Sequence, residues 1–577
     1  MKIKHLLPIL LAVASCCGPK PGVHTLHILS TNDVHGCWFD STYTDGRVKN
    51  SLFAIYSTIS DFKQRYGEDN VLLLDAGDCL QGDNAPYYYN YIDTVAPHLF
   101  PRIMHYMGYD AIAVGNHDIE AGHGVYDRVT ADLESYGIPF LAANAIRNDN
   151  GKTWFPPYKV FKKAGLKVLV LGYTNANNAG WVPAERYSGM HFESLVPQVQ
   201  QDVDRIKAKV KPDVTIALMH SGAGKGDGSQ PENQALDLRN TLRGVDFIVY
   251  AHDHRPRVEN ADTMVIMNSG SHARFLAHGT LTANVGKDRK VVKTLDVELI
   301  PTVKENADKG MKEAFAGEFG TVKAFTLSPV GSMDFDLRTR DAYKGMSAYT
   351  NLLHTLALGC TPATISIAAP LTYDGTVKAG ELAFNDLFTI YPFENQLFIL
   401  KMTGREIKDY LEYSYEQWIQ TFVPGGHILK IQQADDLRLD RKGWSFKGRA
   451  YNFDSAAGIN YTVDVTKPFG QRISISGMAG GHPFEADREY NVAMTSYRAA
   501  GGGDLLSKGA GIQNPGERTV KRYPEIRNIL YQYLAQTGAL EEAVISDPAR
   551  IGHWEFVPKD LANRVIAQDM ELLFPTF

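Results

Sequence analysis

Cysteine is scarce in this chain, which has only five cysteines among its 577 residues. Cys16 and Cys17 lie at the N-terminal targeting segment, so Cys37, Cys79 and Cys360 remain for the folded part. Three thiols cannot form the disulfide framework that stabilises many small secreted domains. A single disulfide between Cys37 and Cys79 remains an alternative, since both lie near polar loops and an oxidising compartment would permit it. We expect buried free thiols instead.

The sequence also lacks a strong charge of either sign, because its formal net charge is −6. This mild balance gives no reason to expect nucleic acid or an acidic membrane surface as a partner, and nothing indicates an obligate protein partner. Internal repeats and low-complexity tracts are absent, and no segment after the N-terminus resembles a membrane helix. With 44% hydrophobic and 11% aromatic residues, the chain can form two or more domains with real cores.

The first sixteen residues are interpreted as a lipoprotein signal peptide. Two lysines precede an apolar run at 6–14, which is too short to span a bilayer. Residues 13–16 read Val-Ala-Ser-Cys and resemble a bacterial lipobox, in which Cys16 carries the lipid. The alternative is an ordinary signal peptide. We expect an exported protein that touches the membrane only through this lipid anchor, at the periplasmic face or the cell surface.

Polar residues that can bind metal follow five short apolar segments of the first half. The apolar segments are 25–29, 71–74, 111–114, 214–219 and 247–250. Helical stretches lie between them, for example at 50–66 and 196–210. This alternation predicts a layered α/β domain over residues 24–300. In such folds ligands bind at the carboxyl ends of the strands.

The polar residues at these strand ends form a set of seven nitrogen and oxygen ligands. They are Asp33, His35, Asp78, Asn116, His220, His252 and His254. A single histidine at a strand end is usually only hydrogen-bonded, but five such coincidences favour one shared site. The number suits two divalent metal ions that share a bridging carboxylate. Because no thiolate is needed, soft-metal sites are disfavoured, and Zn²⁺, Mn²⁺ or a similar ion is expected.

The motifs of the first half resemble those of the calcineurin-like metallophosphoesterases, and more closely those of the exported 5′-nucleotidase family. They are Thr-Asn-Asp-Val-His-Gly at 31–36, Gly-Asp at 77–78, Gly-Asn-His-Asp at 115–118, and the pair His252 and His254. Segments 391–397, 403–407 and 451–454 resemble the nucleotide-binding domain of the same family. The Tyr-Arg-Ala step at 497–499 resembles the 2′,3′-cyclic-nucleotide 2′-phosphodiesterase/3′-nucleotidase branch.

This resemblance implies an α/β protein of two domains. The first is a four-layer α/β-β/α metallophosphoesterase sandwich at 24–300. A linker at 301–330 leads to a C-terminal α+β substrate-binding domain at 331–577.

The resemblance also implies roles for the site residues. Asp78 bridges the two ions, Asp33, His35 and His254 complete one coordination sphere, and Asn116, His220 and His252 complete the other. His117 is the unligated catalytic group, and either Glu120 or Asp118 holds its tautomer. Two positions depart from the UDP-sugar hydrolase branch, which carries Gln at the place of His254 and Asp at the place of Glu120.

Nucleotide selection is expected from the second domain. Tyr497 and Tyr451 are the expected walls of a base sandwich, with Phe453 close behind. Asp504 is expected to accept from ribose hydroxyls, Asn395 to contact the base edge and Arg498 to support phosphate.

The predicted function is metal-dependent hydrolysis of 2′,3′-cyclic nucleotides and 3′-nucleotides to nucleoside and phosphate outside the cytoplasm. One alternative is a 5′-nucleotidase or UDP-sugar hydrolase that acts on 5′-monophosphates. A second is a surface binding protein without catalysis, and a third is a hydrolase of another oxoanion ester, such as a thiosulfonate carrier.

Overall fold

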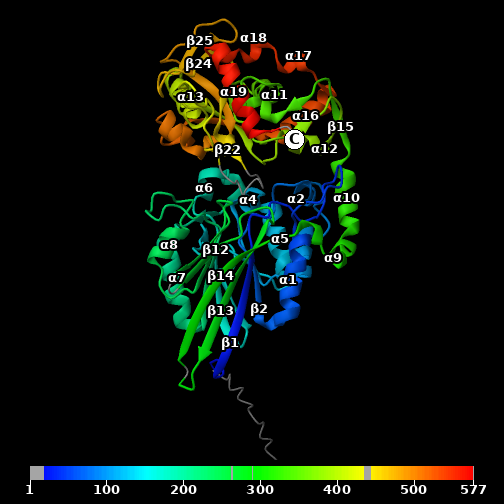
Figure 1. Ribbon diagram of the computed structural model, residues 1–577, viewed down its shortest axis with the longest axis vertical. Coiled ribbons are helices and arrows are strands. Elements are labelled where there is room, and N and C mark those ends of the chain that lie inside the picture. The colour runs from blue at the N-terminus through cyan, green and yellow to red at the C-terminus, as the bar shows by residue number, and fades with distance from the viewer. Residues whose placement is uncertain (1–17, 262–263, 289, 434–442, 576–577) are drawn as a thin grey trace, which may run out of the picture.

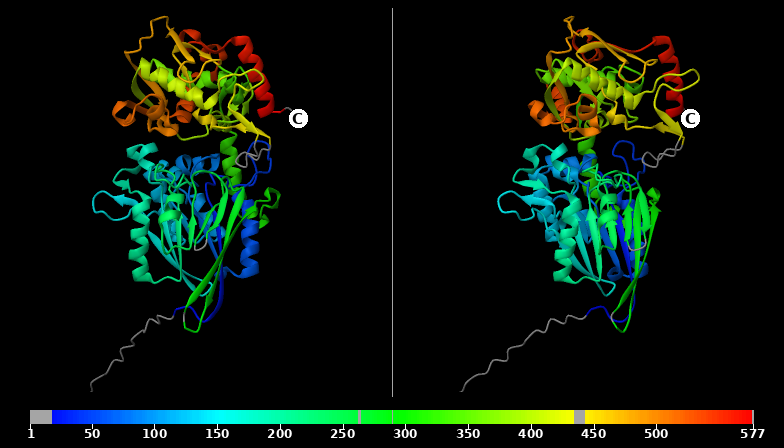
Figure 2. Two further views of the ribbon diagram at one scale, coloured as in Figure 1. Left: turned by 60° about the vertical axis from the view of Figure 1, so that its left-hand side comes forward. Right: turned by 90° about the vertical axis from the view of Figure 1, so that its left-hand side faces the viewer.

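The computed structural model describes residues 18–261, 264–288, 290–433 and 443–575, so Cys16 and the expected signal peptide lie outside the described residues. The chain forms two lobes, one above the other, in all three views (Figures 1 and 2). Helices α9 (Lys309–Ala314) and α10 (Ala316–Thr326) lie in the stretch 301–330 that was expected to connect the domains. Within the described residues, no helix is long and apolar enough to cross a membrane.

The first lobe is built on two six-stranded sheets. The first sheet has the order β14 (Val291–Pro301), β13 (Phe275–Val285), β1 (Gly22–Thr31), β2 (Val71–Asp75), β3 (Ala111–Ala113) and β4 (Phe140–Leu141). The second has the order β11 (Arg257–Ala261), β12 (Met264–Asn268), β10 (Phe247–Val249), β9 (Val214–Met219), β7 (Leu166–Tyr173) and β6 (Tyr158–Lys163). Strands β1 to β4 are parallel, as are β7, β9, β10 and β12, so the carboxyl ends of each set meet at one edge.

Alternating side chains of the strands face two different apolar layers, as strand geometry requires. Leu72 and Leu74 of β2 pack between the two sheets with Val168 and Ile216 of the second sheet. Leu73 faces the other way, into a cluster that includes side chains of α1 (Leu52–Tyr66), α3 (Leu99–Met107) and α5 (His123–Ser135). Helices α7 (Leu195–Val210) and α8 (Ala235–Thr241) cover the second sheet. The four-layer sandwich is therefore confirmed.

All five strands expected from the sequence are present, as β1, β2, β3, β9 and β10. The two expected helices are α1 and α7. Helix α1 begins after Ser51, whose Oγ accepts the backbone N–H of Ala54 at 3.1 Å and so caps the helix.

The second lobe has a five-stranded mixed sheet with the order β23 (Ser455–Ala457), β17 (Ile365–Ala368), β26 (Glu489–Thr495), β20 (Gln396–Thr403) and β27 (Thr519–Glu525). Helices α11 (Ala348–Cys360), α13 (Gly404–Trp418) and α16 (Ile526–Thr537) pack with it, and α19 (Lys559–Leu573) packs against β29 (Trp554–Val557), which makes this an α+β domain. Helix α11 begins after Ser347, whose side chain accepts the N–H of Thr350, and a 3₁₀ turn occupies Thr339–Tyr343 before it.

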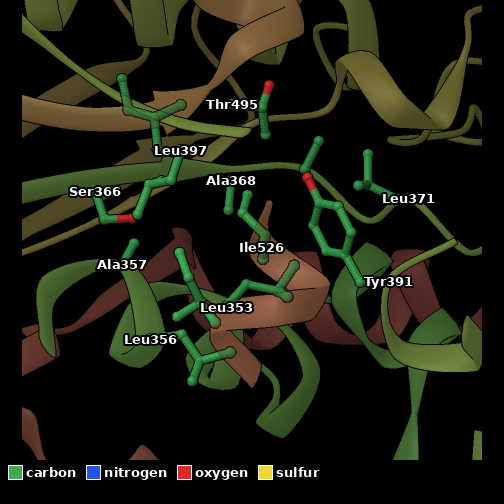
Figure 3. Close-up of a pocket in the computed structure, with 13 residues that line it drawn as sticks. Leu353, Leu356, Ala357, Ser366, Ala368, Leu371, Tyr391, Leu397, Thr495 and Ile526 are labelled. Carbon is green, nitrogen blue, oxygen red and sulfur yellow. The ribbon is translucent and has the colours of Figure 1, made fainter. Parts of the chain in front are cut away.

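A small apolar cavity lies inside this lobe, among α11, β17, β20 and α16 (Figure 3). Leucine and isoleucine side chains such as Leu353, Leu397 and Ile526 line most of it, and it has room for about one water molecule. It is therefore a gap in the packing and not a nucleotide site.

The three cysteines of the described residues are free thiols. Cys79 is buried and Cys37 partly buried, but Cys360 is exposed at the end of α11, so the expectation of burial was wrong for Cys360.

Candidate metal and catalytic site

The seven expected ligands come from loops at the carboxyl ends of strands in both sheets. Ligand atoms of Asp33, His35 and His254 all lie within 4.8 Å of one another. The same holds for a second group of Asp78, His220 and His252. Each group combines residues of both sheets. Helix α4 (Asn116–Glu120) brings Asn116 to the second group, where its Oδ1 lies 2.9 Å from His252 Nδ1.

Five of the seven residues have a left-handed backbone. The φ angles are 48° at Asp33, 47° at His35, 63° at Asp78, 77° at His252 and 58° at His254. Residues other than glycine rarely adopt this conformation, and it costs about 1–3 kcal/mol at each position. Strain of this kind concentrates at functional sites, where the surrounding fold enforces it.

The two carboxylates of the site are held in their charged form. Burial raises the pKa of Asp33, but the charges of His254 and His220 outweigh burial and lower it to about 2. Burial also raises the pKa of Asp78, but the charges of His220 and His117 outweigh burial and hold this pKa well below its ordinary value. Anionic oxygens at these positions suit divalent cations.

Two imidazoles of the site are neutral, because burial lowers their pKa. The pKa of His252 falls to about 3, mainly by burial and then by the charge of His220. Burial and the charge of His254 lower the pKa of His35 well below its usual value. A neutral imidazole has the free lone pair that a metal ion needs.

Several nitrogens and oxygens of the site fit metal ions. His220 Nδ1 lies 2.8 Å from the carbonyl oxygen of Ala76, which leaves Nε2 as the ligand atom. That Nε2 is fully buried, lies 3.1 Å from Asp78 Oδ2, and has no partner with hydrogen-bond geometry. His35 Nε2 and His254 Nε2 face each other at 2.9 Å. One of these nitrogens can donate to the other in the absence of metal, and both have the lone pair with which an imidazole binds a cation.

His117 is held by Glu120. Its Nδ1 lies 2.7 Å from Glu120 Oε2, and Gln81 Nε2 donates to the same oxygen at 3.1 Å. The backbone N–H of His117 donates to Asp78 Oδ1 at 2.8 Å. Burial lowers the pKa of His117, but the charge of Asp78 and the hydrogen bond to Glu120 outweigh burial and raise it to about 9.

Asp118 has a different role, so the alternative that it holds His117 was wrong. Its buried carboxylate accepts four backbone N–H groups, from Gly115 at 2.8 Å and from Asp78, Cys79 and Leu80 at 3.0 Å each. Asp118 therefore fixes the loop that carries Asp78, and its oxygens are occupied.

Tyr451 and Tyr497 lie together on the second lobe, each half-buried. Their ring centroids are 6.2 Å apart and their planes cross at 86°, which is an edge-to-face pair and not a parallel sandwich. Phe453 was a wrong choice for a base wall. It is fully buried, and its ring stacks on Trp418 at 5.7 Å, so both of its faces belong to the core.

Arg498 is also structural, and a direct phosphate contact was the wrong expectation. Its buried guanidinium forms an ion pair with Asp454 at 2.8 Å and donates to the carbonyls of Tyr451, at 2.9 Å, and Gly502. A charge neutralised and buried in this way supports the loop of Tyr451 and offers little to a ligand.

The two remaining expected contacts are less defined. Asp504 is exposed, has a left-handed φ of 63°, and forms an ion pair with Lys508 at 2.8 Å. Asn395 donates from Nδ2 to the Tyr391 hydroxyl at 3.3 Å, and its carbonyl accepts the N–H of Ile526 at 2.9 Å. Roles of Asp504 at the ribose and of Asn395 at the base stay predictions.

Two residues near the metal loops were not found from the sequence. The ring of His272 lies 5.4 Å from that of His35 and 6.2 Å from that of His254, and its φ is 56°. His272 lies in a polar stretch that follows the apolar strand β12. The pattern that predicted the other ligands, a polar residue shortly after an apolar strand, is therefore present here too. Trp181 stacks on His252 at 5.1 Å, and no local pattern marked it.

The second lobe reaches the metal loops. Arg449 NH2 donates to the carbonyl of Asp253, between two of the ligands, at 3.3 Å, and its guanidinium lies 5.9 Å from the ring centre of Tyr451. Helix α14 (Ser496–Ala499), which carries Tyr497, lies against α6 (Asn178–Trp181) of the first lobe. Figure 1 shows α4 and α6 at this junction, facing the second lobe.

Comparisons with known proteins agree with this architecture. Residues 26–256 match the calcineurin-like phosphoesterase family, and residues 321–508 match the 5′-nucleotidase, C-terminal domain. The chain is 25% identical to the trifunctional nucleotide phosphoesterase protein YfkN of Bacillus subtilis over 97% of its own length, and it spans only 42% of that relative.

A second relative is matched over most of both proteins. It is the 2′,3′-cyclic-nucleotide 2′-phosphodiesterase/3′-nucleotidase of Haemophilus influenzae, with 23% identity over 92% of this chain and 87% of the relative.

A solved structure also has the same fold. It is that of a Staphylococcus aureus protein assigned as a 5′-nucleotidase, with a TM-score of 0.76 and 20% identity over 92% of this chain and 99% of that one. The matches cover both lobes in the order in which the chain presents them. The chain therefore consists of a calcineurin-like phosphoesterase domain followed by a 5′-nucleotidase C-terminal domain, and these domains indicate a hydrolytic phosphoesterase.

Proposed function

We propose that this protein hydrolyses nucleotide phosphoesters outside the cytoplasm, with 2′,3′-cyclic nucleotides and 3′-nucleotides as substrates and nucleoside and phosphate as final products. The observation that carries the nucleotide part is the position of Tyr451 and Tyr497. These rings belong to the second lobe, yet Arg449 beside them bonds to the loop between His252 and His254. A phosphoester held at the metal loops thus has two aromatic rings within reach of its organic part.

The metal ligands of this proposal are the two groups that the fold brings together. Asp33, His35 and His254 would hold one divalent ion, His220, His252 and Asn116 would hold the other, and Asp78, which lies in the second group, would be shared by both. The anionic carboxylates, the neutral imidazoles of His35 and His252, and the buried Nε2 of His220 beside Asp78 support this assignment. When bound, two such ions supply an activated water nucleophile and neutralise charge on the phosphoryl group.

His117 is the group proposed to act on the leaving oxygen. Glu120 accepts from its Nδ1, so Nε2 is free to donate a hydrogen bond or a proton to the oxygen that leaves phosphorus. The carboxylate also stabilises the charged imidazolium, because it forms a charge-assisted bond at 2.7 Å. The same side chain fixes the orientation of the ring.

Tyr451 and Tyr497 bind the base by stacking, which is worth about 1–3 kcal/mol per base and tolerates different bases. Their edge-to-face arrangement means that one ring has to turn before a base fits between them. Arg498 and Asp454 fix the loop of Tyr451 while this happens.

The cyclic and 3′-phosphate preference is proposed from the Tyr-Arg-Ala step at 497–499 and from the relative that is named for this activity. The test is phosphate release by the purified full chain, with Mn²⁺ or Zn²⁺, from 2′,3′-cyclic AMP, 3′-AMP and 5′-AMP. We expect release from the first two. Release from 5′-AMP alone would replace the proposal by a 5′-nucleotidase, and release from none, with metal bound, would favour a binding protein.

Export and lipid anchoring through Cys16 form a separate part of the proposal, which rests on the lipobox-like segment at 13–16. Expression with a radiolabelled fatty acid in a bacterial host tests it. We expect label in the wild-type chain and none in the Cys16→Ser variant. Label in both would refute the anchor.

A further inference from the structure

Trp181 occupies an unusual position beside the metal loops. It ends α6, a single helical turn that follows β7 of the second sheet. Its indole lies nearly parallel to the imidazole of His252, with ring centroids 5.1 Å apart and an angle of 22° between the planes. The side chain is only half-buried. Part of a large aromatic surface therefore stays accessible next to a metal ligand.

The loop before Trp181 is held by several specific hydrogen bonds. Asn178 is fully buried; its Nδ2 donates to Thr174 Oγ1 at 3.0 Å and its backbone carbonyl accepts the N–H of Val182 at 2.8 Å, while its side-chain Oδ1 has no hydrogen-bond partner. The N–H of Asn177 donates to Asn175 Oδ1 at 2.9 Å. The bonds to Thr174 and Val182 hold the turn that carries Trp181, although the buried amide of Asn178 is only partly satisfied. This arrangement fixes the position of the indole.

The second lobe lies next to α6, the helix that ends in Trp181. Helix α14, which carries Tyr497, lies against α6. Helix α6 thus contacts His252 through Trp181 and also lies against the helix that carries Tyr497. A nucleotide with its phosphate at the metal loops and its base at Tyr497 has its sugar between these two points.

We propose that Trp181 is a specificity-determining residue that packs against the ribose of the bound nucleotide. This inference rests on the proposed nucleotide activity and deepens it. An indole offers a broad apolar face, which suits the C–H groups of a sugar and is indifferent to the identity of the base. The contact excludes water from the sugar and favours nucleotides over phosphoesters that lack a ring sugar.

The test measures a ratio of two specificities in the full chain with Mn²⁺. For each protein, kcat/KM for 3′-AMP is divided by kcat/KM for glycerol 2-phosphate, which has neither ribose nor base. Trp181→Ala should lower this ratio about 10-fold to 100-fold, the range expected for the loss of one aromatic contact. Trp181→Phe should recover most of it. Trp154→Ala is the matched control, because Trp154 is also half-buried in the first lobe but stacks on Arg147 at 4.0 Å.

Three results would overturn the inference. If Trp181→Ala lowers both specificities equally, or loses bound metal by elemental analysis, Trp181 only supports His252. An unchanged ratio makes it a bystander. If the wild-type protein hydrolyses glycerol 2-phosphate but no nucleotide, the proposed function itself fails, which is visible before any variant is made.

Discussion

Glu120 holds His117 in the structure, so we predict that Glu120→Gln weakens catalysis without loss of metal. The carboxylate lies 2.7 Å from Nδ1 and is only 13% exposed, so the lost bond is charge-assisted and partly buried. A bond to a charged group contributes about 1.5–3 kcal/mol, and a neutral one about 0.5–1.5 kcal/mol. The difference of about 1–1.5 kcal/mol predicts a fall in kcat of about 5-fold to 13-fold, near the lower end of the range of about 10-fold to 100-fold for replaced supporting carboxylates.

The same change has a predicted effect on pH dependence. Glu120 is one of the groups that raise the pKa of His117, so its neutralisation lowers that pKa. A proton donor must be protonated, and activity is therefore lost as pH rises through its pKa. In Glu120→Gln the alkaline loss of kcat should move to lower pH than in the wild type.

Asp118→Asn is the matched comparison, because Asp118 is the neighbouring carboxylate with a different role. An amide has one oxygen in place of two, so about two of the four backbone N–H groups lose their acceptor. Each unsatisfied buried donor costs about 1–3 kcal/mol, which predicts a loss of about 2–6 kcal/mol in stability. Thermal unfolding and steady-state kinetics of both variants measure these effects. Full activity in Glu120→Gln, combined with a normally stable but inactive Asp118→Asn, would refute the assignment.

Three further predictions concern the metal ions and the base site. Chelation with EDTA should abolish activity and lower the unfolding temperature, and Mn²⁺ should restore both. Ions at 100 times their Kd add about 2.7 kcal/mol to the free energy of unfolding. An unchanged unfolding temperature would therefore contradict the metal site. Asp78→Asn should lower the metal content measured by elemental analysis and abolish turnover, whereas turnover with full metal would exclude a bridging role. Tyr497→Ala should raise KM for 3′-AMP about 10-fold without unfolding the protein. Phe453→Ala should instead lower the stability of the protein by about 3–5 kcal/mol. The reverse pattern would assign base binding to Phe453 and core packing to Tyr497.

The metal-loop residues could be predicted because their signal is local. Each one follows an apolar strand within a few residues, and parallel strands bring such residues to one edge of a sheet. The partner of His117 was undecided, since Asp118 and Glu120 are both within reach in sequence. Only the fold shows that four backbone N–H groups occupy Asp118.

The residues of the second lobe were harder to predict, because their roles depend on distant packing. Tyr451 and Phe453 are alike in sequence, but Phe453 faces Trp418 in the core while Tyr451 lies at the junction. Arg498 finds its partner Asp454 on another segment. The candidate role of Trp181 depends on tertiary contacts, because α6 meets both His252 and the second lobe only in the folded chain.

Each group of ligands combines residues from both sheets, which has a consequence for the apolar layer between the sheets. Leu74, Val168 and Ile216 pack in this layer, and Leu74 and Ile216 each lie four residues before a ligand, Asp78 and His220. A change of volume there slides one set of ligands past the other, since close-packed interiors transmit strain. The packing of this layer therefore affects the distance between the two groups of ligands. Substitutions within the layer are expected to change metal preference and turnover even when every residue of the site is unchanged.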